Sequence, residues 1–191
     1  MKLWLLRHAP VLLPPGLCYG ASDVPADEAL TRQAAQAATA RLPADLPVWV
    51  SGLRRAQQLA HALQAQRPDL APLRIDSRLN EMDFGCWELQ AWDAIPHAAV
   101  EEWVKAFTHH RFGGVESTQC VIDRVGQAIA DLRAALGADG QAVWITHAGV
   151  IRAINYIAAH GSQRPVDLDL WPTDAIAPGA SQEIIIKFES N

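Results

Sequence analysis

The sequence LWLLRH at residues 3–8 is the first indication of the fold class, because a continuous apolar run ends there in a basic pair. Continuous rather than alternating apolar runs are typical of strands that are buried on both faces of a parallel sheet. Two further runs of this kind lie at Val48–Val50 and Ala142–Ile145. We expect a fourth strand at Glu183–Phe188 and a fifth near Leu73–Asp76.

Helical patterns separate these runs along the chain. Two shorter helical stretches, broken at Pro96, are expected between about Leu89 and Phe107. The alternation of strand and helix predicts an α/β fold, a three-layer sandwich with a mostly parallel sheet and helices on both faces. The longer helices are expected at Leu30–Leu42, Leu53–Gln66, Ser117–Leu136 and Val150–Ala159.

Length and composition indicate one globular domain. The chain has 191 residues, half of them apolar, and its 16 Lys and Arg against 21 Asp and Glu give a net charge of −5. This length fits a single domain, residues 1–191, with a helical insertion around residues 89–107. The acidic balance argues against nucleic acid as a partner without excluding an anionic substrate. No apolar run approaches the roughly 18 residues of a membrane span.

The cysteines and the amino terminus point to the cytoplasm. Cys18, Cys86 and Cys120 show no CxxC spacing, and their number is odd. That pattern fits a reducing compartment better than a disulfide framework or a zinc site. The apolar start of the chain is too short for a signal peptide and is interrupted at Arg7.

The residues that follow the three central strands carry the chemistry. In open α/β sheets, ligands bind at the carboxyl ends of the strands. Arg7 and His8 follow the first apolar run, Ser51 to Arg55 follow the second, and His147 follows the third. We therefore expect two histidines and at least two arginines to meet at one edge of the sheet.

Two histidines and two arginines in one place suit a phosphate group. Guanidinium groups bind phosphate oxygens in pairs and stay charged at any working pH. A neutral imidazole can attack phosphorus, and we expect the charges of the flanking arginines to lower the pKa of His8 and keep it neutral. Glu81 is the candidate acid for the leaving oxygen.

Five motifs, in order, resemble those of the histidine phosphatase superfamily, also called phosphoglycerate mutase-like. They are LRHA (6–9), SGLRRA (51–56), LNEMDFGCWE (79–88), GVES (114–117) and THAG (146–149). The resemblance covers nearly the whole chain and implies the phosphoglycerate mutase-like fold. The chain departs from the usual pattern at Ala9 and Gly52, where the family has Gly and Pro, and it lacks the Asn that often follows the first motif in mutases.

The resemblance also implies roles for the site residues. His8 is the phosphorylated nucleophile, and Arg7, Arg55 and His147 form the phosphate pocket with it. Glu81 is the proton donor. No metal and no cofactor are implied, since the arginines and histidines neutralise the phosphoryl charge.

Within the superfamily, residues 3–8, 16–25 and 79–85 look most like α-ribazole phosphatase. That enzyme removes the 5′-phosphate of α-ribazole phosphate, or of its cobalamin precursor, so the implied partner is a small-molecule phosphomonoester. Tyr19 and Ala148 are candidate substrate contacts, and packing is the alternative for Tyr19.

Three alternatives stay open. One is a broad-specificity phosphatase, and another is a phosphoglycerate mutase, which returns the phosphoryl group to a substrate. Such mutases are longer than this chain and usually carry the missing Asn. The third is a non-catalytic module that binds phosphorylated ligands. A module of this kind could dispense with His8 or Glu81, and both are present.

Other polar residues near the motifs are interpreted as structural or solvated. Arg54 adjoins Arg55 on a helix and is expected to point elsewhere. Glu88 is expected to be structural, as a charge near a helix N-terminus, and Glu116 either caps the long helix or reaches an arginine. The run HHR at 109–111 is interpreted as a solvated turn, with a basic entrance for an anionic substrate as the alternative.

Tryptophans are frequent around the predicted helical insertion. Trp87, Trp92 and Trp103 lie there, and core packing is their usual role. One of the three is a candidate to line a pocket for a benzimidazole-like base.

Overall fold

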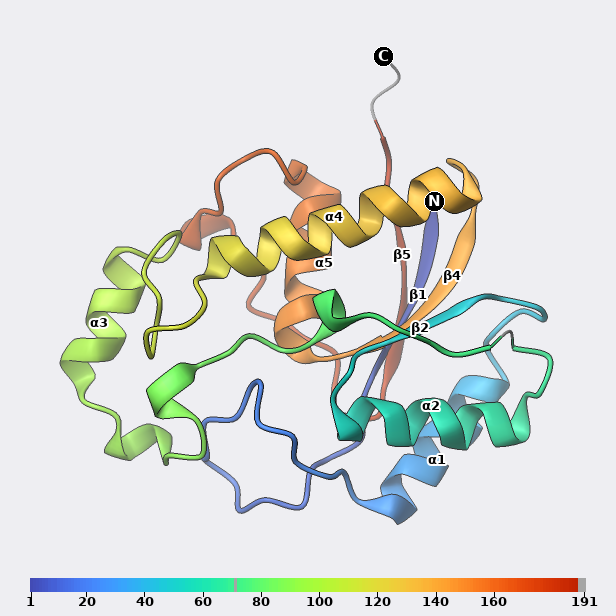
Figure 1. Ribbon diagram of the computed structural model, residues 1–191, viewed down its shortest axis with the longest axis horizontal. Coiled ribbons are helices and arrows are strands. Elements are labelled where there is room, and N and C mark those ends of the chain that lie inside the picture. The colour runs from blue at the N-terminus through green and yellow to red at the C-terminus, as the bar shows by residue number, and fades with distance from the viewer. Residues whose placement is uncertain (71, 189–191) are drawn as a thin grey trace.

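A five-stranded sheet forms the centre of the computed structural model, which describes residues 1–70 and 72–188 (Figure 1). Its strands are β1 (Lys2–Arg7), β2 (Val48–Val50), β3 (Arg74–Ile75), β4 (Gln141–Thr146) and β5 (Ser181–Ile185). They lie in the order β3-β2-β4-β1-β5. The first four are parallel, and β5 runs antiparallel to β1 at one edge. The predicted α/β fold with a mostly parallel sheet is confirmed.

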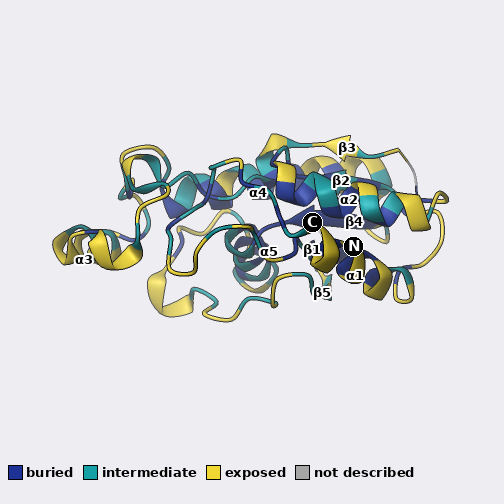
Figure 2. Cartoon of the chain, turned by 90° about the horizontal axis from the view of Figure 1, so that it is seen from below, coloured by how far each residue is buried: buried dark blue, intermediate teal, exposed yellow. Residues whose placement is uncertain are grey.

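Helices cover both faces of the sheet. The five α-helices are α1 (Glu28–Thr39), α2 (Arg54–Gln66), α3 (His97–Lys105), α4 (Thr118–Leu136) and α5 (Ala148–His160). Successive residues of a strand point to opposite faces, so Trp4 and Leu6 pack with α1 and α2 while Leu3 and Leu5 pack with α4 and α5. Figure 2 shows the buried residues gathered along the strands and the inner helix faces, with α3 largely exposed beyond the end of the sheet.

Several element boundaries differ from the sequence-based expectation, most clearly those of β5 and α1. The last strand was expected at Glu183–Phe188, but β5 begins at Ser181 and ends at Ile185. Its antiparallel pairing with β1 ends where Ile185 meets Lys2, because β1 begins at Lys2. The first helix begins at Glu28 rather than Leu30, since Asp27 caps it by accepting the N–H of Leu30.

The expected pair of short helices around Pro96 is only half present. The second is α3, which starts directly after Pro96. The first is a single 3₁₀ turn at Trp92–Ala94, so the expectation of a helical stretch there was wrong. The backbone of Gln90 and Trp92 is instead paired with residues 16–18, and a helix over these residues would break those hydrogen bonds.

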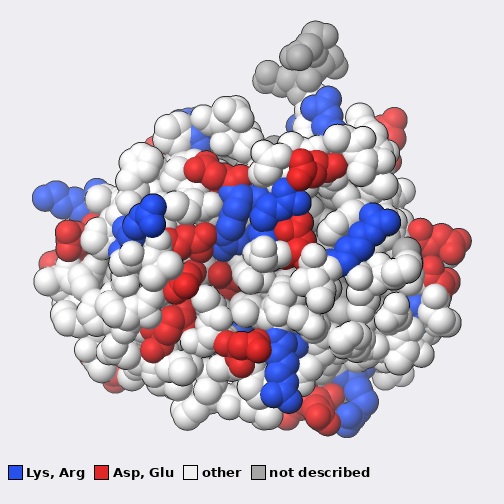
Figure 3. All heavy atoms as spheres, in the orientation of Figure 1, with Lys and Arg blue, Asp and Glu red and all other residues white. Residues whose placement is uncertain are grey.

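The surface carries charges of both signs. On the face shown in Figure 3, basic and acidic side chains are interspersed, and neither sign forms an extended patch. Across residues 1–70 and 72–188, no helix combines the length and the apolar character that a membrane crossing requires. All three cysteines are free thiols, and burial raises the pKa of the Cys18 thiol to about 12.

Candidate active site

Three neighbouring parallel strands end at the same edge of the sheet. Arg7 of β1 lies opposite Thr146 of β4, and Val50 of β2 lies opposite the residue before Thr146. The residues that directly follow these three strand ends, His8, Ser51 and His147, therefore lie close together. His8 and His147 are both buried there, with their ring centroids 5.1 Å apart. The expected meeting of the two histidines is thus present in the structure.

The hydrogen bond of His8 settles which ring nitrogen is free. Its Nδ1 lies 2.7 Å from the carbonyl oxygen of Ala9. A carbonyl oxygen only accepts, so Nδ1 carries the proton and Nε2 keeps its lone pair. Burial, and then the charges of Arg55 and Arg7, lower the pKa of His8 to about 3 against the opposing effect of the Ala9 bond. The neutral state was expected, but burial contributes more to it than the arginines do.

His147 has the opposite tautomer, because a chain of hydrogen bonds fixes its proton. The Oδ1 atom of Asn80 accepts the backbone N–H of Gly52 at 2.7 Å and the hydroxyl of Ser51 at 2.8 Å. Having donated its only proton, Ser51 accepts one from Nε2 of His147 at 2.7 Å. Nδ1 of His147 has no hydrogen-bond partner among the described residues.

Burial also governs the charge of His147. The residue is completely buried, and this lowers its pKa well below the usual range for histidine. The charges of Arg55 and then His8 act in the same direction. Both imidazoles are therefore neutral near pH 7, each with one free lone pair.

The two predicted arginines are each anchored at one end. The Nη atoms of Arg55 donate to the carbonyl oxygens of Ser22, at 2.7 Å, and Gly20. Nη1 of Arg7 donates to the carbonyl oxygen of Ile176 at 2.8 Å. Burial lowers the pKa of both guanidinium groups, which nevertheless stay charged. Their Nε atoms have no partner in the part of the chain that the structure describes.

Glu88 holds the loop on which Arg55 is anchored. Its carboxylate accepts the backbone N–H groups of Gly20, Ala21, Ser22 and Phe84, and the hydroxyl of Ser22. Burial raises the pKa of Glu88, but these hydrogen bonds outweigh it and hold the pKa below its usual range. The structural role agrees with the expectation, whereas the expected place near a helix N-terminus was wrong. The partners on the loop lie 66–68 residues away in sequence, which local pattern does not reveal.

Glu81 lies at the N-terminus of α5. Its Oε2 accepts the N–H of Gly149 at 2.9 Å and its Oε1 accepts the N–H of Met82 at 3.1 Å. A Cβ atom at position 149 would overlap Oε1 of Glu81, so glycine makes room for the carboxylate. These two N–H groups fix the direction in which the carboxyl group points.

The segment that carries Glu81 is fixed from α4. Arg124 donates to the carbonyl oxygens of Arg78 and Asn80, at 2.6 and 2.7 Å. Glu116 accepts from Arg124 at 2.7 Å and from the N–H of Asp83 at 3.1 Å. Of the two roles considered for Glu116, reaching an arginine is the one observed, while Ser117 caps the helix.

A cavity of about 310 Å³ opens onto the nucleophile candidate, the arginines and Glu81, but the fully buried His147 is not among its lining residues. Its inner part is bounded by Arg7, His8, Arg55 and Glu81, and the candidate substrate contacts Tyr19 and Ala148 are among its lining residues. Tyr19 packs under the guanidinium of Arg55, 5.4 Å from its ring centre. The remaining lining residues are Leu17, Met82, Phe84, Trp92, Trp103, Phe107, Thr118, Val121, Gly149, Arg152 and Trp171.

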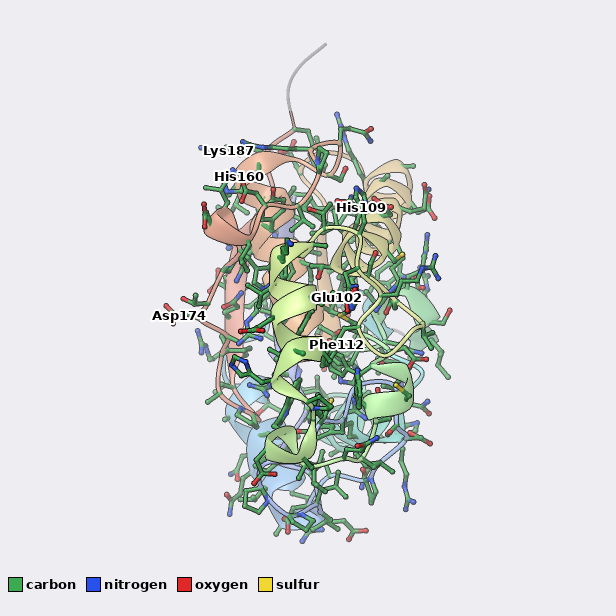
Figure 4. All side chains as sticks on the ribbon, turned by 90° about the vertical axis from the view of Figure 1, so that its left-hand side faces the viewer. Glu102, His109, Phe112, His160, Asp174 and Lys187 are labelled. Carbon is green, nitrogen blue, oxygen red and sulfur yellow. The ribbon has the colours of Figure 1, made fainter. Side chains whose placement is uncertain are left out.

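Other residues near the motifs fall outside the cavity lining. Arg54 is exposed, as expected. A turn at residues 106–109 follows α3, and residues 110 and 111 continue without regular structure. His109 is exposed (Figure 4), which agrees with the solvated interpretation. Of the three tryptophans considered, Trp87 does not line the cavity, whereas Trp92 and Trp103 do.

Sequence reasoning missed Arg152, a third arginine at the cavity. It lies on α5 four residues after Ala148, which places the two on the same helix face. The spacing of four residues from Ala148 could have indicated from the sequence that Arg152 faces the site. Its Nη2 donates to the carbonyl oxygen of Thr173 at 3.1 Å. Within residues 1–70 and 72–188, no cluster of three His, Cys, Asp or Glu side chains is arranged to hold a metal ion.

Comparisons with known proteins agree on one family. A family model for the histidine phosphatase superfamily (branch 1) matches residues 3–169. No match to the curated proteins was found. Among solved structures, the TTHB049 protein of Thermus thermophilus is 26% identical with a TM-score of 0.71, over 96% of this chain and 93% of that one.

Two further solved structures bear enzyme names. A mycobacterial glucosyl-3-phosphoglycerate phosphatase in complex with VO3 is 25% identical, with a TM-score of 0.78, over 95% of this chain and 91% of that one. A phosphoglycerate mutase from Thermus thermophilus is 26% identical, with a TM-score of 0.70, over 96% and 92%.

Proposed function

Because the chain belongs to the histidine phosphatase superfamily (branch 1), we propose that it hydrolyses phosphomonoesters through a phosphohistidine on His8. The observation that carries the proposal is the state of this imidazole. Nε2 has a free lone pair, the ring is neutral, and the two guanidinium groups of Arg7 and Arg55 border the same cavity. A buried neutral nucleophile beside fixed positive charges suits attack on an anionic phosphate.

The first step transfers the phosphoryl group to the enzyme. Arg7 and Arg55 bind the outer oxygens, His147 binds one of them once its Nδ1 has taken up a proton, and Nε2 of His8 attacks phosphorus in line with the leaving oxygen. The N–P bond forms as the P–O bond to the alcohol breaks. The Glu81 carboxyl donates its proton to the departing oxygen.

The second step returns the enzyme to its starting state. Glu81, now ionised, takes a proton from a water molecule as that water attacks the phosphohistidine. The new P–O bond forms, the N–P bond breaks, and inorganic phosphate leaves. The hydrogen bonds from Gly149 and Met82 hold the carboxylate in place for both roles.

The setting of this reaction follows from the same groups. The guanidinium groups of Arg7 and Arg55 offset the phosphoryl charge, so the proposed steps need neither a metal nor a cofactor. We place the enzyme in the cytoplasm, where its three free thiols stay reduced.

For the substrate we propose α-ribazole 5′-phosphate. The segments 16–25 and 79–85 support this choice through their resemblance to α-ribazole phosphatase. The aromatic residues that line the outer cavity also support it, because a benzimidazole-type base is flat and largely apolar.

A phosphoglycerate mutase is the second candidate, favoured by the likeness to the Thermus thermophilus mutase. In a mutase the phosphohistidine returns its phosphoryl group to a substrate instead of water. Incubation with 3-phosphoglycerate separates the two functions, because a phosphatase releases inorganic phosphate and a mutase forms 2-phosphoglycerate.

The test of the proposal is a panel of phosphomonoesters that includes α-ribazole 5′-phosphate. We expect phosphate release by the wild type and none above background by His8→Ala. A wild type that turns over nothing, or a His8→Ala variant as active as the wild type, would contradict the proposal. Preference for a different phosphomonoester would remove only the choice of substrate.

A further inference from the structure

The two edges of the sheet differ in how far they are open to another strand. At one edge, β3 is only two residues long, and Pro72, which has no N–H to donate, lies two residues before it. At the other edge, β5 has five residues and no proline. Figure 2 shows β5 at the border of the molecule, beside β1. An unpaired edge of this length is a template for a further strand.

The backbone groups of β5 point alternately toward β1 and away from it. Ile186 exchanges two hydrogen bonds with Met1, at 2.9 and 3.0 Å, so its N–H and C=O groups face β1. In an antiparallel ladder every second residue has this orientation, and the residues between them direct their groups outward. The outward residues near the end of the strand are therefore Glu183, Ile185 and Lys187.

The neighbouring outward group, at Ser181, is already occupied. Its carbonyl oxygen accepts from Nη1 of Arg41 at 3.3 Å. Within residues 1–70 and 72–188, the outward backbone groups of residues 183, 185 and 187 have no hydrogen-bond partner. The free edge of the sheet is thus the segment 183–187, which we call the β5 edge.

The side chains of the β5 edge are complementary to a second copy of the same segment. Ile185, at its centre, is 62% exposed, whereas Ile184 and Ile186 pack against the core on the other face. Glu183 and Lys187 are exposed and lie two residues to either side of Ile185, on the same face. Figure 4 shows Lys187 extending away from the ribbon. In an antiparallel pair centred on Ile185, each glutamate therefore lies opposite the lysine of the other copy.

We infer that two copies of the chain dimerise by antiparallel pairing of their β5 edges across a two-fold axis at Ile185. This pairing joins the two sheets into one, and each outward residue exchanges two hydrogen bonds with the residue opposite. Registers centred on Glu183 or Lys187 put like charges directly opposite each other, which is unfavourable. Edge charges often prevent pairing between copies, but opposite charges on either side of the centre favour it here.

The dimer leaves the cavity open. The β5 edge lies beside the start of β1, where Ile185 is opposite Lys2, whereas His8 follows the end of that strand. In an extended strand these two places are about 20 Å apart. We therefore expect the activity per chain to be the same in monomer and dimer, and the dimer does not depend on the proposed phosphatase function.

Sedimentation velocity of the full chain at several concentrations tests the dimer. Because the interface is small, we expect a dissociation constant between about 1 µM and 1 mM. Glu183→Lys and Lys187→Glu each put like charges opposite each other in both facing pairs, and each should raise this constant at least about tenfold. A wild type that stays monomeric up to about 1 mM would overturn the inference and leave the β5 edge to a strand of another protein.

Mixing the two variants tests the register itself. In a mixed dimer, the lysines of Glu183→Lys face the glutamates of Lys187→Glu, so dimers should form again in the equimolar mixture. Misfolding of the variants cannot produce this result. A mixture that stays as monomeric as its two components, or single variants that dimerise as well as the wild type, would overturn the inference.

Two control variants separate the register from net charge. Glu28→Lys and Lys105→Glu make the same charge changes at exposed positions of α1 and α3, away from the β5 edge. Both should dimerise with the dissociation constant of the wild type. A tenfold weaker dimer in these controls as well would show that net charge, and not pairing of the β5 edges, governs the association.

Discussion

The two histidines differ in where they hold their proton. His8 carries it on Nδ1, because its partner is the carbonyl of Ala9, and His147 carries it on Nε2, because Ser51 can only accept. The free lone pairs are therefore Nε2 of one ring and Nδ1 of the other. One ring is set up to attack phosphorus, while the other reaches a phosphoryl oxygen only by gaining a proton or changing tautomer.

The burial of His8 makes the stability of the protein sensitive to acid. Its pKa is about 3 in the folded protein and about 6.5 in the unfolded chain, so only the unfolded chain takes up this proton between those values. The stability contribution is fully present above about pH 6.5 and is lost as the pH falls toward 3. Lowering the pH from 7 to about 4.5 should reduce the unfolding free energy of both the wild type and His8→Gln. We expect this reduction to be about 2 kcal/mol smaller in His8→Gln than in the wild type, because glutamine does not titrate.

Urea unfolding at the two pH values measures this difference. His61→Gln, which alters an exposed histidine on α2, should behave like the wild type. An identical pH dependence in all three proteins would mean that His8 is not held neutral by the fold.

Gly149→Ala should separate activity from stability. The added Cβ would overlap Oε1 of Glu81, which is the end of a flexible side chain and can turn away at low cost. Alanine also favours a helix more than glycine does, by about 1 kcal/mol. We therefore expect kcat to fall at least about tenfold, through the misplaced acid, while the melting temperature stays the same or rises.

Steady-state kinetics and thermal unfolding of the same preparation check this. Glu81→Gln provides the comparison, since it removes the acid without altering the helix. A Gly149→Ala variant with full activity would show that the observed position of the Glu81 carboxylate is unimportant for the reaction.

At the scale of elements, the site depends on irregular segments held by charged side chains. The loop around Gly20 is held by Glu88, and the segment around Glu81 is held by Arg124 with Glu116. Neither segment has regular structure of its own, so buried hydrogen bonds replace the backbone ladders that position the strands.

Glu88→Gln should therefore weaken both the fold and phosphate binding. An amide cannot accept from four backbone N–H groups as a carboxylate does, and its NH2 group would face other donors. We expect a loss of about 1–3 kcal/mol in unfolding free energy and a raised KM, because Arg55 is anchored on the same loop.

Chemical unfolding and KM measurements test this, with Glu28→Gln on the exposed surface of α1 as the control. Because the pKa of Glu88 is lower when folded, its contribution is present above about pH 4.3 and is lost as the pH falls through the folded value. An unchanged KM in Glu88→Gln would show that the loop around Gly20 does not contribute to phosphate binding.

Elements with a strong local pattern could be predicted from the sequence, and those set by distant contacts could not. The central strands and α4 follow from apolar runs and helical periodicity. The end of β5 depends on where β1 begins, and the segment before the 3₁₀ turn at Trp92–Ala94 is paired through its backbone with residues 16–18 instead of forming a helix. The contacts of Glu88, Asn80 and Arg152 likewise join segments that are far apart in sequence or on different elements.

For the whole molecule, the net charge of −5 conceals a local concentration of positive charge. Parallel strand order brings two basic strand ends together, and burial keeps both histidines neutral between guanidinium groups. The strand order thereby gives a weakly acidic protein a candidate phosphate site that is locally positive. The position of this site could be predicted because strand order follows simple rules, but its proton arrangement could not.

The central claim is that His8 carries the phosphoryl group during turnover. The most direct measurement mixes the enzyme with a ³²P-labelled phosphomonoester and stops the reaction rapidly without acid. Peptide mapping then locates the label. We expect an acid-labile, alkali-stable label on the peptide that contains His8, absent from His8→Ala and longer-lived when Glu81 is changed to Gln. Turnover without any labelled enzyme under single-turnover conditions, or a label on another residue, would contradict the account.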